Sequence, residues 1–270
     1  MLLNLCLISA VHGQQEPLTA DQVLFDQAVR RFEDEDYAGA AEDFRQFMTR
    51  FPQSQLLARS HYNLALTYDR MNDFETSKKL FLEILEQPYN ERDENGLMEP
   101  YTQYKHHSCR HLAAIALREN DYKSAEKYIH LFDKKYPYQH FCGNEWSAYD
   151  MFKAVMKARV YEGTDEVRKA MEELLPFIFS DALASNDDVL DELSGILERN
   201  YTRDSIQQEF KSALMSLEVK ETKKNTSVTI LLYGVTIQVQ DFFFEQAADV
   251  SGKEHYQKIV EENALFKKFL

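Results

Sequence analysis

The chain contains few of the residues that interrupt regular structure or crosslink a fold. Its 270 residues include eight glycines, six prolines, three cysteines and one tryptophan. So few glycines and prolines exclude a collagen-like or low-complexity chain, and three cysteines are too few for a disulfide scaffold. Because 44% of the residues are hydrophobic, the chain is able to bury a sizeable core as one or two domains.

Basic charge and long apolar runs are also scarce. Lys and Arg together number 31 against 45 for Asp and Glu, which gives a formal net charge of −14 at pH 7. A phosphate backbone is repelled by such a balance, so we expect no nucleic-acid partner. No stretch approaches the roughly 20 apolar residues that a membrane-spanning helix needs, so we expect no transmembrane segment.

The first thirteen residues, MLLNLCLISAVHG, resemble a signal peptide without the usual positive start. Val11 and Gly13 are small enough for the positions before a signal-peptidase site. We therefore expect residues 1–13 to be a signal peptide and the protein to be exported to the periplasm or cell envelope. The alternative is a short buried N-terminal helix in a cytoplasmic protein. Export would leave Cys109 and Cys142, and the sequence does not settle whether they are bridged.

One five-residue phrase occurs three times in the first half of the chain. It consists of Asp, an aromatic residue, two variable residues and a small residue, at 36–40, 73–77 and 121–125. Apolar residues at helical spacing lie on both sides of each phrase. Pro52, Pro88 and Pro137 follow at comparable distances and would end the second helical segment. The repeated unit is therefore a pair of antiparallel helices.

This pattern resembles the tetratricopeptide repeat, in which paired small residues let two helices pack closely and proline closes the second helix. The resemblance implies an all-α fold of helical hairpins stacked into a superhelix. Gln27, at a position that is usually apolar in the family, departs from the pattern, as does an extra loop at 88–103. The matching small pairs are Ala28 with Ala40, Ala65 with Ser77, and Ala113 with Ala125.

The resemblance divides the chain into a repeat domain at 21–180 and a C-terminal region at 181–270. We expect units at about 21–52, 57–88 and 104–137, and a degenerate fourth unit at 146–177 with Ala158 and Ala170 as its small pair. Amphipathic helices at 187–198 and 203–219 are expected to cap the repeats.

A change of period marks the C-terminal region. Two-residue alternation of β-branched residues on both sides of Tyr233 and Gly234 predicts a small β-hairpin with its turn at these two residues. The alternative is one long strand with a bulge at Gly234. A last helix is expected from about Lys253 to Phe269. The hairpin would lie on the helical body, with the aromatic run Phe242 to Phe244, or would offer an edge to a partner strand.

The first helices of such repeats line a concave groove. Aromatic and arginine side chains are the ones that most often dominate binding energy, and several fall on this face. We expect a protein or peptide segment, extended or helical and acidic at one end, to bind there. The alternative is that the apolar members pack under the N-terminal segment and the arginines pair with neighbouring carboxylates. The candidate groove residues are Phe25, Val29, Phe32, Arg59, Tyr62, Leu66, Arg70, His107, Arg110 and Arg118.

Candidate chemistry is sparse. A group of histidines and cysteines has spacing that would suit zinc, and His107 and His111 share a helix face. We expect ordinary core or surface roles for this group, with Cys109 as a small core residue, and we expect no cofactor, metal or catalytic residue. A metal-dependent enzyme built on the group and a small-ligand or peptide-binding module remain the alternatives. The group comprises His106, His107, Cys109, His111, His140 and Cys142.

The sequence therefore favours a non-enzymatic interaction scaffold. Relatives that bind chaperone tails use a Lys/Asn/Arg clamp on the groove, and the matching positions here hold Phe25, Val29, Tyr62 and Leu66. That absence disfavours a chaperone-tail adaptor. The identity of the partner and the oligomeric state are left open.

Overall fold

The computed structural model describes residues 18–89, 103–139, 143–180, 183–221, 226–240 and 252–270. The chain divides into two compact units, Met1–Leu80 and Phe81–Leu270, with the division inside helix α4. The predicted signal peptide, His140, Cys142, the run Phe242 to Phe244 and most of the loop at 88–103 lie outside the described residues.

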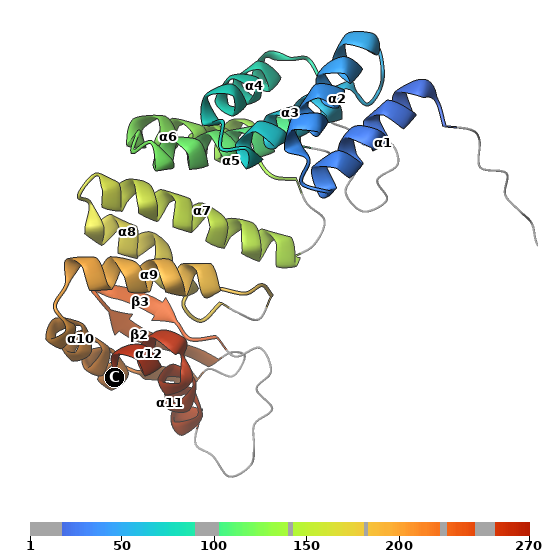
Figure 1. Ribbon diagram of the computed structural model, residues 1–270. Helices are drawn as coiled ribbons and strands as arrows, with labels where there is room; N and C mark the ends of the chain where they lie inside the picture. The colour runs from blue at the N-terminus through green and yellow to red at the C-terminus, as the bar shows by residue number, and fades with distance from the viewer. Residues whose placement is uncertain (1–17, 90–102, 140–142, 181–182, 222–225, 241–251) are drawn as a thin grey trace, which may run out of the picture. The chain divides into compact units, whose positions relative to one another are not determined.

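Helices in consecutive packed pairs make up most of the described chain (Figure 1), which confirms the predicted helical-hairpin repeat fold. Each of the four predicted hairpins is present. They are α1 (Ala20–Glu33) with α2 (Tyr37–Arg50), α3 (Leu57–Arg70) with α4 (Phe74–Glu86), α5 (Tyr104–Arg118) with α6 (Tyr122–His130), and α7 (Gly143–Gly163) with α8 (Val167–Leu174). Short segments η1 (Leu131–Lys135) and η2 (Leu175–Phe177) extend α6 and α8.

The same turn joins the helices of every hairpin. The residue two positions before each second helix has left-handed backbone. In three of the turns it is Asn or Asp, which tolerate this conformation, and in the first it is Glu. The following Asp36, Asp73 and Asp121 then cap the second helix by accepting a hydrogen bond from the backbone N–H three residues on, at 3.0 to 3.1 Å. The left-handed residues are Glu35, Asn72, Asn120 and Asp165, with φ of 57° to 62°.

The fourth turn has the left-handed residue but lacks the aspartate cap. Glu166 stands where the other turns have aspartate, and its carboxylate instead contacts Thr164 and Lys169. The longer side chain makes no cap hydrogen bond to the helix. This difference accounts for the weaker repeat signal of the fourth hairpin in the sequence.

The small residues predicted to let the paired helices approach are fully buried in all four hairpins. Ser77 replaces alanine in the second pair, and its hydroxyl donates to the Ala65 carbonyl at 3.0 Å, so no polar group is left unsatisfied. Each pair is 0% exposed: Ala28 and Ala40, Ala65 and Ser77, Ala113 and Ala125, and Ala158 and Ala170.

A contact inside the first hairpin explains why Gln27 stands at a position that is usually apolar. The Gln27 amide donates to the carboxylate of Asp43 at 2.9 Å, and Arg31 forms an ion pair with the same carboxylate at 3.1 Å. Asp43 is only 5% exposed. A buried carboxylate needs such partners, so Gln27 compensates for Asp43 across the α1–α2 pair.

The C-terminal region contains α9 (Asp187–Asn200) and α10 (Arg203–Met215), then strands β1 (Glu218–Glu221), β2 (Thr226–Leu232) and β3 (Val235–Gln238) in an antiparallel sheet of order β1-β2-β3. The predicted hairpin and its two-residue turn are confirmed, with positive φ at Tyr233 and Gly234. The prediction of helix up to residue 219 was wrong, because Val219 pairs with Val228 in a third strand.

The sheet buries one face against the helices around it. Figure 1 shows the strands among α9, α10, α11 (Gly252–Glu262) and α12 (Ala264–Phe269). The expected single last helix is broken at Asn263, whose side chain caps α12 and also donates to the Ile178 carbonyl at 2.8 Å. The core-facing residues of the sheet are Val228, Ile230, Leu232, Ile237 and Val239, each 4% exposed or less.

Candidate functional site

The predicted groove residues occupy equivalent places in successive first helices. Counted from the buried small residue, Phe25, Tyr62 and Arg110 lie three positions before it. Arg59 and His107 lie six positions before it, and Arg70 and Arg118 lie five positions after it. We call these positions, taken within each compact unit by itself, the first-helix face.

In the N-terminal unit, α1 turns much of its face inward. Phe25 is only 6% exposed and meets Phe44 and Phe47 edge-on, with ring centres 5.9 and 5.8 Å apart. Val29 and Phe32 are half-buried against the same cluster. These three residues therefore stabilise the first hairpin by packing against α2. The alternative raised from the sequence, packing under the N-terminal segment, involves residues outside those that the structure describes.

On α3, the first helix of the second hairpin, the predicted groove residues are less buried than Phe25 is on α1. Arg59, Tyr62 and Leu66 are half-buried, and Arg70 is exposed at the end of the helix. A guanidinium, a phenol ring and an aliphatic side chain thus follow one another along one side of α3. The guanidinium and the phenol ring are of the types that most often dominate binding interfaces.

In the C-terminal unit, α5 and α7 come together through the first-helix face. The guanidinium carbon of Arg110 lies 3.9 Å from the centre of the Phe152 ring, within the range of a cation–π contact. Arg110 and Phe152 are both half-buried, while Arg118 is exposed at the end of α5. The stacked pair joins the third and fourth hairpins into one surface.

Ion pairs continue this surface from α7 to α9. Arg159 contacts Glu192 at 2.6 Å, and Arg199 holds Glu162 with two hydrogen bonds of 2.9 and 2.8 Å. The hydrogen bond from Arg199, more than the added charge, holds the pKa of Glu162 below its usual value. Side-chain contacts therefore link α5, α7 and α9 in succession.

Sequence reasoning missed Phe152, Arg159 and Glu162. The signal was present, because these residues lie six positions before, one after and four after the small residue Ala158. That spacing is the one that selected residues in the other three hairpins. The degenerate phrase of the fourth unit, with Val167 in the place of the aromatic residue, hid the equivalence.

The histidines of α5 point to different neighbours. The His111 ring stacks on Phe81 of α4, with ring centres 4.8 Å apart and planes 9° apart. His107 is half-buried, and burial together with the nearby His106, Arg110 and His111 lowers its pKa to about 3. Cys109 is fully buried, which confirms its role as a small core residue.

His106 is the most enclosed of the three, at 1% exposed. Its Nδ1 lies 2.8 Å from the carbonyl of Tyr136, and because a carbonyl can only accept, Nδ1 carries the proton. Burial lowers the pKa of His106 to about 4, so the ring is neutral at pH 7. Its other nitrogen is buried without a hydrogen-bond partner in the described part of the chain. The rings around it are those of His107, Phe132, Tyr138 and Tyr149.

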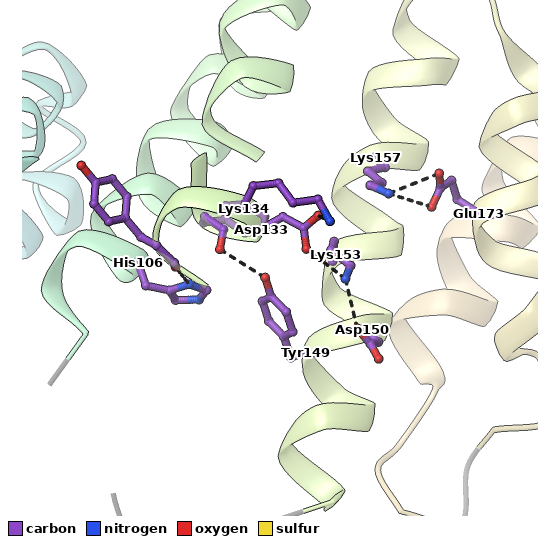
Figure 2. A network of polar contacts seen from close by, with 10 residues as sticks. His106, Asp133, Lys134, Tyr149, Asp150, Lys153, Lys157 and Glu173 are labelled. Atoms are coloured by element: carbon purple, nitrogen blue, oxygen red, sulfur yellow. Dashed lines mark hydrogen bonds and ion pairs between the residues drawn. The ribbon is translucent and has the colours of Figure 1, made fainter. Parts of the chain in front are cut away.

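A lysine network links η1 to α7 beside this aromatic group. Figure 2 shows Lys153 between Asp133 and Asp150, at 3.1 Å from each carboxylate. Although burial alone would raise it, the hydrogen bonds from Lys134 and Lys153 hold the pKa of Asp133 below its usual value. These contacts are arranged as structural ion pairs between the third and fourth hairpins.

Two of the candidate metal ligands, His140 and Cys142, lie outside the described residues. Among the residues that the structure describes, no group of three or more His, Cys, Asp or Glu side chains is placed to hold a metal ion. Across the same residues, no helix has both the length and the apolar character needed to cross a membrane.

Comparison with known proteins adds no assignment. No protein-family model matches the chain. A search of curated proteins likewise gives no match.

Proposed function

We propose that this protein is a non-enzymatic interaction scaffold of the tetratricopeptide type that binds a peptide or protein segment on its first-helix face. The observation that supports this most directly is the stacking of Arg110 on Phe152 at 3.9 Å. It brings side chains from the first helices of the third and fourth hairpins into contact, as a continuous binding surface requires.

The chemistry of the face favours a segment with apolar and acidic side chains. Arg118 and Arg70 are exposed, and arginine forms strong, directional hydrogen bonds with carboxylates. Half-buried Tyr62 and Leu66 supply apolar surface on the helix that carries Arg70, and half-buried Phe152 supplies it beside Arg110. An extended or helical segment could use both kinds of contact at once.

We further propose that the scaffold acts in the cell envelope after export. The support is the signal-like start of the sequence at residues 1–13. Sequencing the N-terminus of the protein isolated from its own cells tests this part. A start at Gln14 is expected, and an intact Met1 would contradict export.

Co-purification from the native cell tests the binding role. The tagged protein is crosslinked and compared with a variant that carries Arg70→Ala and Arg118→Ala. A matched control carries Arg168→Ala and Arg203→Ala, two exposed arginines on α8 and α10. We expect a partner that is lost with the first variant and kept with the second. Equal recovery with both variants would overturn the assignment of the face.

A further inference from the structure

The helix α6 and its extension η1 carry a row of basic side chains on one side. Lys123, Lys127, His130 and Lys134 follow at spacings of four, three and four residues, which places them on one helical face. All four are exposed, and the Lys134 side chain is 66% exposed. We call this row the α6 stripe. None of its members belongs to the first-helix face.

The stripe is largely uncompensated by acidic neighbours. No carboxylate of the described residues forms an ion pair with Lys123 or Lys127, although the protein has a net charge of −14. Lys134 is paired with Asp133 at 3.0 Å, but that carboxylate is shared with Lys153. A local positive surface on an acidic protein attracts anionic groups selectively.

A cleft of about 210 Å³ opens beside the stripe, between α6–η1 and α7. Its apolar lining comes from Ile129, Val160 and Tyr161, and its polar lining is mixed in charge. Lys157 lines it as well and reaches Glu173 only at 3.4 and 3.5 Å, as Figure 2 shows. The remaining lining residues are Glu126, His130, Asp133 and Lys134.

We propose that the α6 stripe and this cleft form a second binding surface, for an acidic protein segment that inserts an apolar side chain into the cleft. Carboxylates of the segment pair with Lys123, Lys127 and Lys134. The inserted side chain contacts the apolar lining and is held between α6 and α7. Charge complementarity directs the encounter, and the apolar contact fixes the position of the segment along the stripe.

The surface fits a protein segment better than another polyanion. Glu126 and Asp133 line the cleft and would repel an unbroken run of phosphates. The apolar lining has no counterpart in a sugar-phosphate backbone or in a flat layer of lipid headgroups. A peptide is able to alternate carboxylates with apolar side chains. This inference stands independently of the function proposed for the first-helix face.

Peptide binding to the full chain tests the proposal. The probe is a fluorescein-labelled peptide of four Glu-Glu-Leu repeats, and its affinity is measured by fluorescence anisotropy at low salt. A variant with Lys123→Gln, Lys127→Gln and Lys134→Gln is expected to bind about tenfold more weakly. A control with Lys211→Gln, Lys253→Gln and Lys267→Gln removes the same charge from other exposed sites and is expected to bind as the wild type does.

Three further probes make the result decisive. A peptide with Ser in place of Leu is expected to bind the wild type more weakly, and equal binding would overturn the role of the cleft. Duplex DNA and phosphatidylglycerol vesicles are expected to bind more weakly than the Leu peptide. Tighter binding of either through the same lysines would overturn the choice of a protein partner. The proposal also fails if the wild type does not bind the peptide or if both triple variants lose affinity equally.

Discussion

The ring of Tyr122 lies against the last residue of α7, Gly163. A β-carbon at Gly163 would stand 2.1 Å from two ring atoms of Tyr122, far inside contact distance. Tyr122 is the aromatic residue of the third repeated phrase, and its hydroxyl donates to Asn120 in the turn at 3.0 Å. The aromatic of one hairpin therefore sets how closely the next hairpin approaches, and glycine at the end of α7 makes room for it.

Gly163→Ala is expected to destabilise the protein by about 1–3 kcal/mol, because the ring must move out of its packed position. The free energy of unfolding is measured by urea denaturation. Gly195→Ala is a matched control, since a β-carbon there meets only the flexible end of Arg199 and alanine favours the helix. A stability for Gly163→Ala equal to or above that of the wild type would contradict the packing described.

The aspartates that cap the second helices should each contribute measurably. Asp121→Ala removes the acceptor for the Ser124 N–H, which now bonds at 3.1 Å, and is expected to cost about 1 kcal/mol. Asp121→Asn retains an acceptor and should keep most of that stability. Thermal or urea unfolding of both variants checks the cap, and an equal loss in the two would show that the hydrogen bond is not the cause.

The buried small pairs should not tolerate larger side chains. Ala125→Val adds two methyl groups at a fully buried position between α5 and α6 and is expected to cost about 1–3 kcal/mol. Ala148→Val makes the same substitution at an exposed position of α7, where the added methyl groups meet no packed helix. If the two variants had the same free energy of unfolding, close helix approach would not be the reason for the small residues.

Burial of His106 predicts that stability falls in mild acid. The unfolded chain takes up a proton near pH 6.5, whereas the folded protein holds this imidazole neutral down to about pH 4. The contribution of His106 to stability is therefore complete above pH 6.5, falls as the pH decreases toward 4 and is lost below it. The difference between the pKa of His106 in the unfolded chain and in the folded protein corresponds to about 3 kcal/mol of folding stability.

NMR titration of the His106 ring and urea denaturation from pH 7 to 4 test this expectation. In His106→Phe the decrease in stability over this range should be smaller than in the wild type, whatever the absolute stability of the variant. A His106 ring that titrates near pH 6.5 in the folded protein would contradict the account.

Local signals predicted the helical part of the fold well. The repeated Asp and aromatic phrase marks the capped start of a second helix, and the small pairs mark where two helices touch, so both features act over short distances in the chain. The turn at Tyr233 and Gly234 is local in the same way. The burial of Cys109 followed from its place on the packed face of α5.

Features that depend on distant partners were not predictable from local patterns. Val219 lies in a strand only because Val228 pairs with it, and residues 203–219 by themselves have helical spacing. Asn263 interrupts the last helix because its side chain caps α12 and reaches Ile178.

Site-specific photocrosslinking tests the central claim, binding on the first-helix face, most directly. A photoreactive phenylalanine analogue is placed at Arg118 on the face and, in a second protein, at Lys211 on α10, both exposed. After irradiation in the native cell, we predict a discrete crosslinked partner for position 118 and none for position 211. The same crosslinks from both positions, or none from position 118 with a correctly folded protein, would contradict the account.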